Sequence, residues 1–260
     1  MKKRVRPFIV GNWKMNPATL ARAEKIWVDV QKGLVGRKGQ SDVAIAPPLP
    51  FIIDLKEMAG PQKIEFVSQD VSFHPEGAHT GEVSVSQLRS FGVKCSIVGH
   101  SERRADGETD QMINRKVLAL HEVKSSAIIC VGEKSRDSTG DYFNVVEDQL
   151  SATLAGVKVE DLSRVIIAYE PVWAIGSGKN ANASQVEEMK LFIQKVLSDI
   201  YPREKASMVR IIYGGSVNED NAEELLKVGT VDGFLIGGAS LDAKEFVSII
   251  KIADDYARFV

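Results

Sequence analysis

Eight short apolar runs, most of them rich in β-branched residues, recur along the 260-residue chain and leave room for a helix between one run and the next. They cover residues 8–10, 43–46, 66–68, 95–98, 127–131, 165–168, 209–212 and 233–236. Continuous apolar runs of this length are typical of strands that are buried on both faces. Such strands, when helices connect them, form a parallel sheet whose outer face the helices cover.

The clearest helical pattern lies between the sixth and seventh runs. Six apolar residues fall there on one stripe at helical spacing: Val186, Met189, Ile193, Val196, Leu197 and Ile200. Ser184 and Glu187 precede the stripe with the spacing of a capping box. Eight alternating strand and helix units predict a closed, eight-stranded parallel (β/α)8 barrel, and a doubly wound open sheet is the alternative.

The composition favours one domain without a nucleic-acid or membrane partner. No linker or shift in composition divides the chain, so we expect a single domain over residues 1–260. The 33 basic and 35 acidic residues give a net charge of −2, and only residues 2–4 form a basic run. The apolar run at 8–10 is too short for a signal peptide or a membrane span. We therefore expect a cytoplasmic protein.

Cys95 and Cys130 each lie inside an apolar run. A cysteine in such a position behaves as a small buried hydrophobic residue. The sequence therefore predicts two buried, unpaired thiols and disfavours a disulfide.

Polar residues and glycines gather where five of the predicted strands end. The segments concerned are 11–16, 99–103, Glu170, 213–216 and 237–238. Each has an ordinary structural explanation when taken alone, such as a solvated lysine or a glycine in a turn. In a parallel barrel, however, all carboxyl ends point to one face, so we expect these residues to converge on one site.

Glu170 is the most informative of these residues. It ends the strand predicted at 165–168 and precedes a loop with glycines at positions 176 and 178. A carboxylate on a rigid strand beside a loop that can close over a ligand is typical of α/β enzymes. The sequence therefore predicts an enzyme.

Six segments resemble the triosephosphate isomerase family. They are Asn-Trp-Lys-Met-Asn at 12–16, Gly-His-Ser-Glu-Arg-Arg at 99–104, Cys-Val-Gly-Glu at 130–133, Ala-Tyr-Glu-Pro-Val-Trp-Ala-Ile-Gly-Ser-Gly at 168–178, Tyr-Gly-Gly-Ser-Val at 213–217 and Gly-Phe-Leu-Ile-Gly-Gly-Ala-Ser at 233–240. They occur in the family's order and span essentially the whole chain. The resemblance implies a TIM barrel that interconverts dihydroxyacetone phosphate and D-glyceraldehyde 3-phosphate through an enediolate, without a metal or organic cofactor. It also implies a place in glycolysis and gluconeogenesis.

The resemblance assigns the catalytic roles to four residues. Glu170 is the base, because an apolar strand and a closing loop can desolvate its carboxylate. His100 is a neutral electrophile, at the start of a short helix whose dipole disfavours a cationic imidazole; this family is a standard example of such a pair. Lys14 supplies positive charge beside the substrate oxygens, and Asn12 donates a hydrogen bond to the oxyanion.

Further positions follow from the same resemblance. Substrate-binding residues are Asn12, Lys14, Gly176, Ser216, Gly237 and Gly238. The two glycine-rich segments after strands seven and eight allow close approach of phosphate and can precede helix N-termini. The loop 171–181 closes over the substrate, Tyr213 and Ser216 latch it, and Ser101 and Glu102 support the site.

The segment 77–82 corresponds to the family loop that inserts into a second subunit, and this implies a homodimer. Thr80, Glu82 and Arg103 belong to that interface, with Thr80 approaching the partner's Asn12 and Lys14. His74 and His79, spaced by five residues, are only a weak candidate for a metal site. We expect His121 on or near the surface. Ser177, Asn180 and His79 depart mildly from the family's usual residues.

Two other functions remain open from the sequence. Another phosphate-binding barrel, such as an aldolase or an aminoaldose isomerase, would use Lys14 as a Schiff base or act on larger phosphates. A barrel without catalysis would serve as a binding module and would bind phosphate without turnover.

Overall fold

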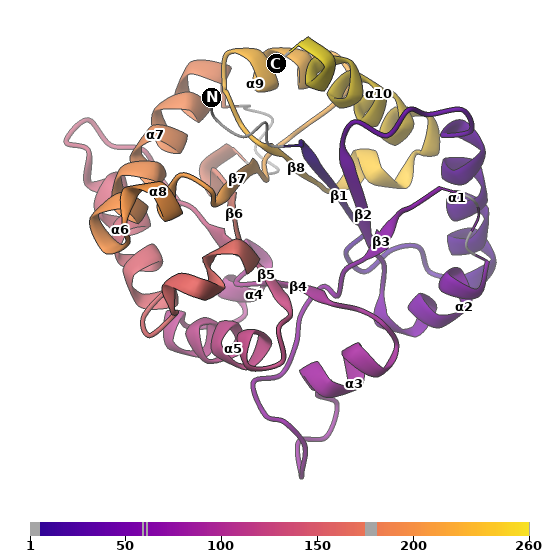
Figure 1. Ribbon diagram of the computed structural model, residues 1–260, viewed down its shortest axis with the longest axis horizontal. Coiled ribbons are helices and arrows are strands. Elements are labelled where there is room, and N and C mark those ends of the chain that lie inside the picture. The colour runs from indigo at the N-terminus through magenta and orange to yellow at the C-terminus, as the bar shows by residue number, and fades with distance from the viewer. Residues whose placement is uncertain (1–5, 59, 61, 175–180, 260) are drawn as a thin grey trace.

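Eight parallel strands form one sheet at the centre of the molecule, and helices surround it (Figure 1). The structure is a computed structural model that describes residues 6–58, 60, 62–174 and 181–259. The strands are β1 (Phe8–Asn12), β2 (Asp42–Ala46), β3 (Glu65–Phe66), β4 (Cys95–Val98), β5 (Ser126–Val131), β6 (Val165–Tyr169), β7 (Arg210–Tyr213) and β8 (Gly233–Ile236). Their order in the sheet is β3-β2-β1-β8-β7-β6-β5-β4.

The sheet closes between its two outermost strands, β3 and β4. A parallel bridge joins Ser68 to Ser96. Its backbone hydrogen bonds run from the Ser68 N–H to the Cys95 carbonyl (3.0 Å) and from the Ile97 N–H to the Ser68 carbonyl (2.9 Å). The prediction of a barrel is therefore confirmed over that of an open sheet. The third strand ends earlier than predicted, because Ser68 pairs only through this bridge.

Helices cover the outside of the barrel (Figure 1). The α-helices are α1 (Leu20–Gly33), α2 (Ile52–Glu57), α3 (Val85–Ser90), α4 (Ser101–Ala105), α5 (Asp110–Glu122), α6 (Asp141–Thr153), α7 (Ala183–Ile200), α8 (Arg203–Ala206), α9 (Ala222–Lys227) and α10 (Ala243–Phe259). The short 3₁₀ helices are η1 (Leu49–Phe51), η2 (Val159–Arg164), η3 (Val172–Ala174) and η4 (Gly238–Leu241). Among the described residues, no helix has the length and apolar character needed to cross a bilayer.

Two hydrophobic clusters follow from the alternation of side chains along each strand. Val10, Ile97 and Ile128 belong to the smaller cluster, together with other alternate strand residues that fill the barrel interior. Ile9 and Ile129, their neighbours along the strands, belong to the larger cluster, which also includes residues of the surrounding helices. The apolar runs are thus buried on both faces, as predicted.

The start of α7 corrects one prediction. Its capping box is formed by Asn182 and Gln185, whose side chains each accept from the other residue's backbone N–H, and not by Ser184 and Glu187. Both pairs have the same spacing, but the helix begins two residues earlier than the predicted box. The apolar stripe is buried as predicted except at Ile200, which is 40% exposed at the last residue of the helix.

His121 corrects another prediction, since it is buried on α5 with 7% exposure. Neither ring nitrogen has a hydrogen-bond partner among the described residues. Burial lowers the pKa of His121. By contrast, Cys95 and Cys130 are free and buried, as the apolar runs predicted.

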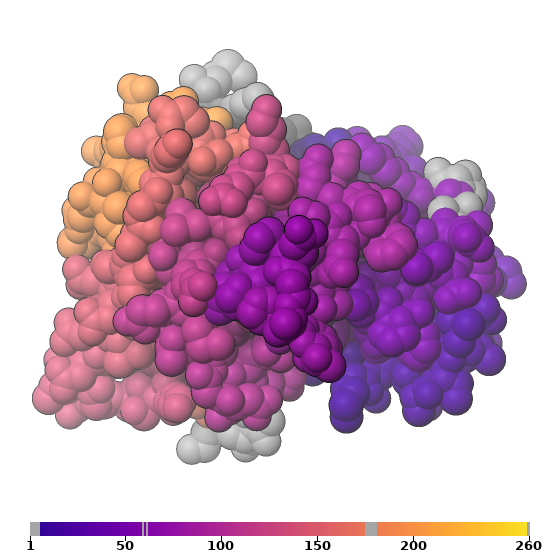
Figure 2. Space-filling view, turned by 90° about the horizontal axis from the view of Figure 1, so that it is seen from below, coloured from indigo at the N-terminus to yellow at the C-terminus, as the bar shows by residue number. Residues whose placement is uncertain are grey.

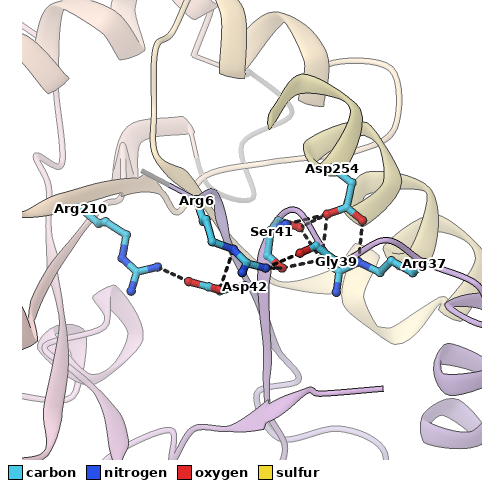
Figure 3. A network of polar contacts seen from close by, with 7 residues as sticks. All are labelled: Arg6, Arg37, Gly39, Ser41, Asp42, Arg210 and Asp254. Atoms are coloured by element: carbon cyan, nitrogen blue, oxygen red, sulfur yellow. Dashed lines mark hydrogen bonds and ion pairs between the residues drawn. The ribbon is translucent and has the colours of Figure 1, made fainter. Parts of the chain in front are cut away.

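A network of polar contacts links the amino ends of the barrel to α10 (Figure 3). Arg37 Nε lies 2.6 Å from Asp254 Oδ2, and the two side chains are 6% and 5% exposed. Asp254 Oδ1 also accepts from the Ser41 N–H and hydroxyl at 2.7 and 2.8 Å. Beside it, Asp42 pairs with Arg210 at 2.9 Å and with Arg6 at 3.3 Å. The network ties the segment before β2 to the final helix.

Candidate active site

The carboxyl ends of β1, β4, β7 and β8 border a cavity of about 380 Å³. Its lining comprises Asn12, Lys14, His100, Gly214, Gly215, Ser216, Val217, Asn218, Leu235, Gly237, Gly238, Ala239 and Glu245. Most of the predicted catalytic and substrate-binding residues therefore share one cavity. Gly176 lies outside the described residues, as do Ser177 and Asn180.

His100 has a fixed orientation at the start of α4. It is the N-cap of this short helix, which confirms the predicted helix start, and its Nδ1 accepts from the Glu102 backbone N–H at 3.2 Å. A ring nitrogen that accepts a hydrogen bond carries no proton, so the proton of the neutral ring is on Nε2. His100 is 8% exposed and lines the cavity. The arrangement leaves Nε2 as the ring nitrogen that can donate a hydrogen bond.

Glu170 lies beside the cavity and is 2% exposed. Its Oε2 accepts from the Ser101 backbone N–H at 2.8 Å. Its Oε1 is 3.3 Å from His100 Nε2 but is not aligned for a hydrogen bond with it, and it has no hydrogen-bond partner among the described residues. Glu170 is thus a buried carboxylate with one oxygen held and the other without a hydrogen bond.

Lys14 is held at three points. Its backbone lies in the left-handed region with φ of 52°, which is costly for a residue with a side chain. The Lys14 N–H donates to Asn12 Oδ1 at 3.0 Å, and the Lys14 carbonyl accepts from Gln69 Nε2 at 2.8 Å. Its ammonium lies 2.6 Å from Glu102 Oε1. Asn12 and Gln69 therefore stabilise the backbone turn that presents the ammonium to the cavity.

Four glycines, at 214, 215, 237 and 238, line the cavity, as predicted. Gly237 directly precedes η4, and a Cβ placed on it would lie 3.4 Å from Lys14 Cε. The segment at 214–216 does not precede a helix directly, since α9 begins only at Ala222. Of the two glycine-rich segments, only the one at 237–238 therefore leads directly into a helix N-terminus, that of η4. Glu245 also lines this end, and burial raises its pKa.

The supporting tyrosine, Tyr213, is fully buried. Its hydroxyl has no hydrogen-bond partner among the described residues, and burial raises its pKa. Near the start of the loop 171–181, Glu133 Oε1 accepts from the Tyr169 hydroxyl at 2.9 Å and from Trp173 Nε1 at 2.7 Å. Glu133 is 1% exposed and holds the residues on both sides of Glu170.

Sequence reasoning gave no role to a chain of ion pairs behind His100. Glu108 Oε2 accepts from the Gly99 N–H at 3.1 Å, and Glu108 also pairs with Lys116. Lys116 reaches Asp70 at 2.6 Å, and Asp70 pairs with Arg103 at 2.8 Å. The sequence signal for these ion pairs is Lys116, which falls on the apolar stripe of α5. In the structure Lys116 is 3% exposed.

Thr80 and Glu82 are exposed on a loop that projects from the barrel between β3 and α3 (Figures 1 and 2). The rings of His74 and His79 stack in this loop with centroids 3.6 Å apart. Among the described residues, no group of three or more His, Cys, Asp or Glu side chains could hold a metal ion.

Comparison with known proteins gives a single family. The family model described as triosephosphate isomerase matches residues 7–253. Relatives named triosephosphate isomerase include one from Chlorobium phaeobacteroides, 42% identical over 97% of this chain and 100% of the relative. Those from Carboxydothermus hydrogenoformans and Thermus thermophilus are 44% and 42% identical over 95% of this chain, and the alignments cover 98% and 99% of the relatives. The chain therefore belongs to the triosephosphate isomerase family of enzymes.

Proposed function

We propose that the enzyme interconverts dihydroxyacetone phosphate and D-glyceraldehyde 3-phosphate through an enediolate. The observation that carries this proposal is that His100 and Lys14 line one cavity together with two pairs of glycines, and that Glu170 Oε1 lies beside that cavity, 3.3 Å from His100 Nε2. This isomerisation needs a base, a hydrogen-bond donor for the carbonyl and an anchor for the phosphate. The site has a candidate for each.

Glu170 is the proposed base that takes a proton from substrate carbon. Its carboxylate is buried beside the cavity, and only one oxygen has a hydrogen bond among the described residues. The oxygen without a hydrogen bond can accept a proton from a substrate placed beside it. To reach a substrate carbon, the side chain would turn away from the Ser101 N–H toward the cavity.

His100 is the proposed electrophile. Because Nδ1 accepts from the Glu102 N–H, the neutral ring presents Nε2–H to the cavity. A donor fixed in this way can stabilise negative charge on both substrate oxygens as the enediolate forms. Asn12 would assist the same oxygens.

Lys14 and the glycine segments are the proposed phosphate anchor. The Lys14 Nζ lies 2.6 Å from Glu102 Oε1. An ammonium held in an ion pair attracts phosphate and is a poor nucleophile for imine formation, so the contact favours the isomerase over an aldolase. Backbone N–H groups near Gly214, Gly215, Gly237 and Gly238 would complete the anchor, with Ser216 and, in the closing loop 171–181, Gly176. Tyr213 would latch this loop.

A coupled assay of the purified protein with dihydroxyacetone phosphate tests the proposal. We expect rapid turnover without any added metal or organic cofactor. Turnover only on larger sugar phosphates, or trapping of the substrate by borohydride on Lys14, would favour the aldolase alternative. Binding of inorganic phosphate without turnover would favour a binding module.

We further propose that the chain works as one domain in a homodimer in the cytoplasm, with a part in glycolysis and gluconeogenesis. The projecting loop with Thr80 and Glu82 supports this assembly, since an exposed loop of this kind can insert into a second copy (Figure 2). Arg103, paired with Asp70, would lie at the same interface. Light scattering should give twice the mass of the chain. Thr80→Arg should shift that mass toward the monomer, and an unchanged dimer would contradict the placement of the loop.

A further inference from the structure

Gly132, the first residue after β5, packs directly against the backbone of the proposed base. A Cβ placed on Gly132 would lie 1.7 Å from the Glu170 carbonyl oxygen and 2.6 Å from its carbonyl carbon. No side chain fits in that space without moving one of the two segments. The Glu170 N–H also donates to the carbonyl of Val131, the residue before Gly132, at 2.8 Å. This hydrogen bond holds the two backbone segments together.

Gln149 of α6 holds Gly132 with both ends of its side-chain amide. Its Oε1 accepts from the Gly132 N–H at 2.8 Å, and its Nε2 donates to the Gly132 carbonyl at 3.2 Å. Two opposed hydrogen bonds to one residue fix both the position and the rotation of that peptide segment. Gly132 has no side chain of its own to lock it in place, so Gln149 provides the lateral support.

Glu170 meets a second glycine on the opposite side. A Cβ on Gly214 would lie 2.8 Å from Glu170 Cγ, and the Gly214 N–H donates to the Tyr169 carbonyl at 2.7 Å. Glu170 therefore lies between two close backbone contacts. Of the two, the contact with Gly132 is set from outside the barrel, by the helix that carries Gln149.

We propose that Gln149 is a positioning residue for Glu170, acting through Gly132. The inference rests on the proposed role of Glu170 as the base. If Gly132 shifts, the backbone of Glu170 shifts with it, and the carboxylate no longer meets the substrate carbon at the right distance. Proton transfer is sensitive to such displacements, and a misplacement of about 1 Å can cost roughly 10²-fold in rate. The proposed phosphate anchor includes neither Gly132 nor Gln149, although its Gly214 contacts Glu170 from the other side.

The test is Gln149→Leu, which keeps the approximate size of the side chain and removes both hydrogen bonds. We expect kcat to fall about tenfold while KM and the inhibition constant of inorganic phosphate change by less than about twofold. A change confined to kcat separates misplacement of the base from weaker substrate binding. Gly132→Ala should lower kcat further, because its Cβ would displace Glu170 directly.

Asn114→Leu is the matched control. Asn114 Nδ2 also makes two hydrogen bonds to backbone carbonyls, those of Thr153 and Ala155 at 3.0 and 2.8 Å, just past the other end of α6. The Asn114→Leu variant should lower the melting temperature about as much as Gln149→Leu does, but it should leave kcat unchanged. Should Gln149→Leu fail to fold, Gln149→Asn, which keeps a shorter amide, replaces it with the same expected pattern.

Two results would overturn the proposal. One is a normal kcat in folded Gln149→Leu, and the other is an equal fall of kcat in the Asn114 control. A wild-type protein without turnover of dihydroxyacetone phosphate would instead overturn the proposed function. The two failures are therefore distinguishable.

Discussion

At the amino ends of the strands, Arg37 and Asp254 are almost fully buried, and their charges meet each other and Ser41 (Figure 3). At the carboxyl ends, by contrast, Glu170 Oε1 and the Tyr213 hydroxyl are just as buried but have no hydrogen-bond partner among the described residues. A buried polar group without a partner costs free energy, whereas a paired network stabilises the fold. The difference teaches that the buried charges at the amino ends are paired and stabilise the fold, whereas these two buried groups at the carboxyl ends contribute no hydrogen bond to it.

Backbone conformation follows the same division. Lys14, at the carboxyl end, has a left-handed backbone, and Asn12 and Gln69 hold it in place. Strain of this kind costs about 1–3 kcal/mol and persists where the surrounding contacts fix it. The comparison predicts that substitutions at the carboxyl ends change rate, whereas substitutions at the amino ends change stability.

The largest expected effect is that of Glu170→Gln. This variant keeps the shape of the side chain but removes the base, so kcat should fall roughly 10³–10⁴-fold with KM nearly unchanged. Steady-state kinetics with dihydroxyacetone phosphate measure it, and thermal unfolding should show no loss of stability. Near-normal turnover would remove Glu170 from the mechanism.

Asp254→Ala should lower the stability of the fold and leave the rate unchanged. It leaves the Arg37 guanidinium buried without its partner, which should lower the free energy of unfolding by about 3–5 kcal/mol. Urea unfolding measures the loss, and kcat at a temperature where the variant is folded should match that of the wild type. A large change in kcat with unchanged stability would break the division between the two ends.

Gln69→Leu tests the support of Lys14. Without its hydrogen bonds to the Lys14 and Ala46 carbonyls, each 2.8 Å long, the strained turn can relax and withdraw the ammonium. We expect kcat/KM to fall about tenfold, with weaker inhibition by inorganic phosphate. An unchanged inhibition constant would show that the turn needs no such support.

The smallest expected effect concerns His121 and pH. Burial lowers its pKa in the folded state, while Asp161 and Arg164 act on it in opposite directions. The unfolded chain, with a histidine pKa near about 6.5, then binds a proton that the folded chain does not, so stability is full above that pH and falls below it. Melting temperatures from pH 7 to pH 5 should fall more for the wild type than for His121→Leu. Substitution of the exposed His79 by Gln is the control, and equal slopes in the wild type and His121→Leu would contradict the prediction.

The fold was predictable because its signal is repeated. Apolar runs mark all eight strands, and the largest difference is at the third, which ends at Phe66 because Ser68 pairs through a bridge and extends no strand. Local capping was less predictable: Asn182–Gln185 and Ser184–Glu187 have equal spacing, and only the helix start decides between them. The burial of His121 was missed although it lies four residues after Val117, on the same stripe of α5 as Lys116.

The positions of Asn12 and Glu170 at one face of the barrel were predictable, because Asn12 ends β1 and Glu170 directly follows β6. Gln69, Glu108 and Gln149 were not, because each acts through a hydrogen bond to the backbone of a residue distant in sequence. Such contacts depend on how elements pack, and a single sequence does not encode that packing in a readable pattern. Lys116 shows how far the sequence alone leads: its place on an apolar stripe indicates that it is buried, but it does not indicate which residues it pairs with.

The most direct measurement follows the substrate hydrogen in deuterated water. If Glu170 removes a proton that exchanges with solvent before it returns, the wild-type enzyme should convert dihydroxyacetone phosphate into an aldehyde that carries deuterium at C2. Glu170→Gln should form this product at a rate lower by orders of magnitude. Product without deuterium, formed at an unchanged rate by Glu170→Gln, would indicate direct hydride transfer between the two carbons and would contradict a site built around a carboxylate base.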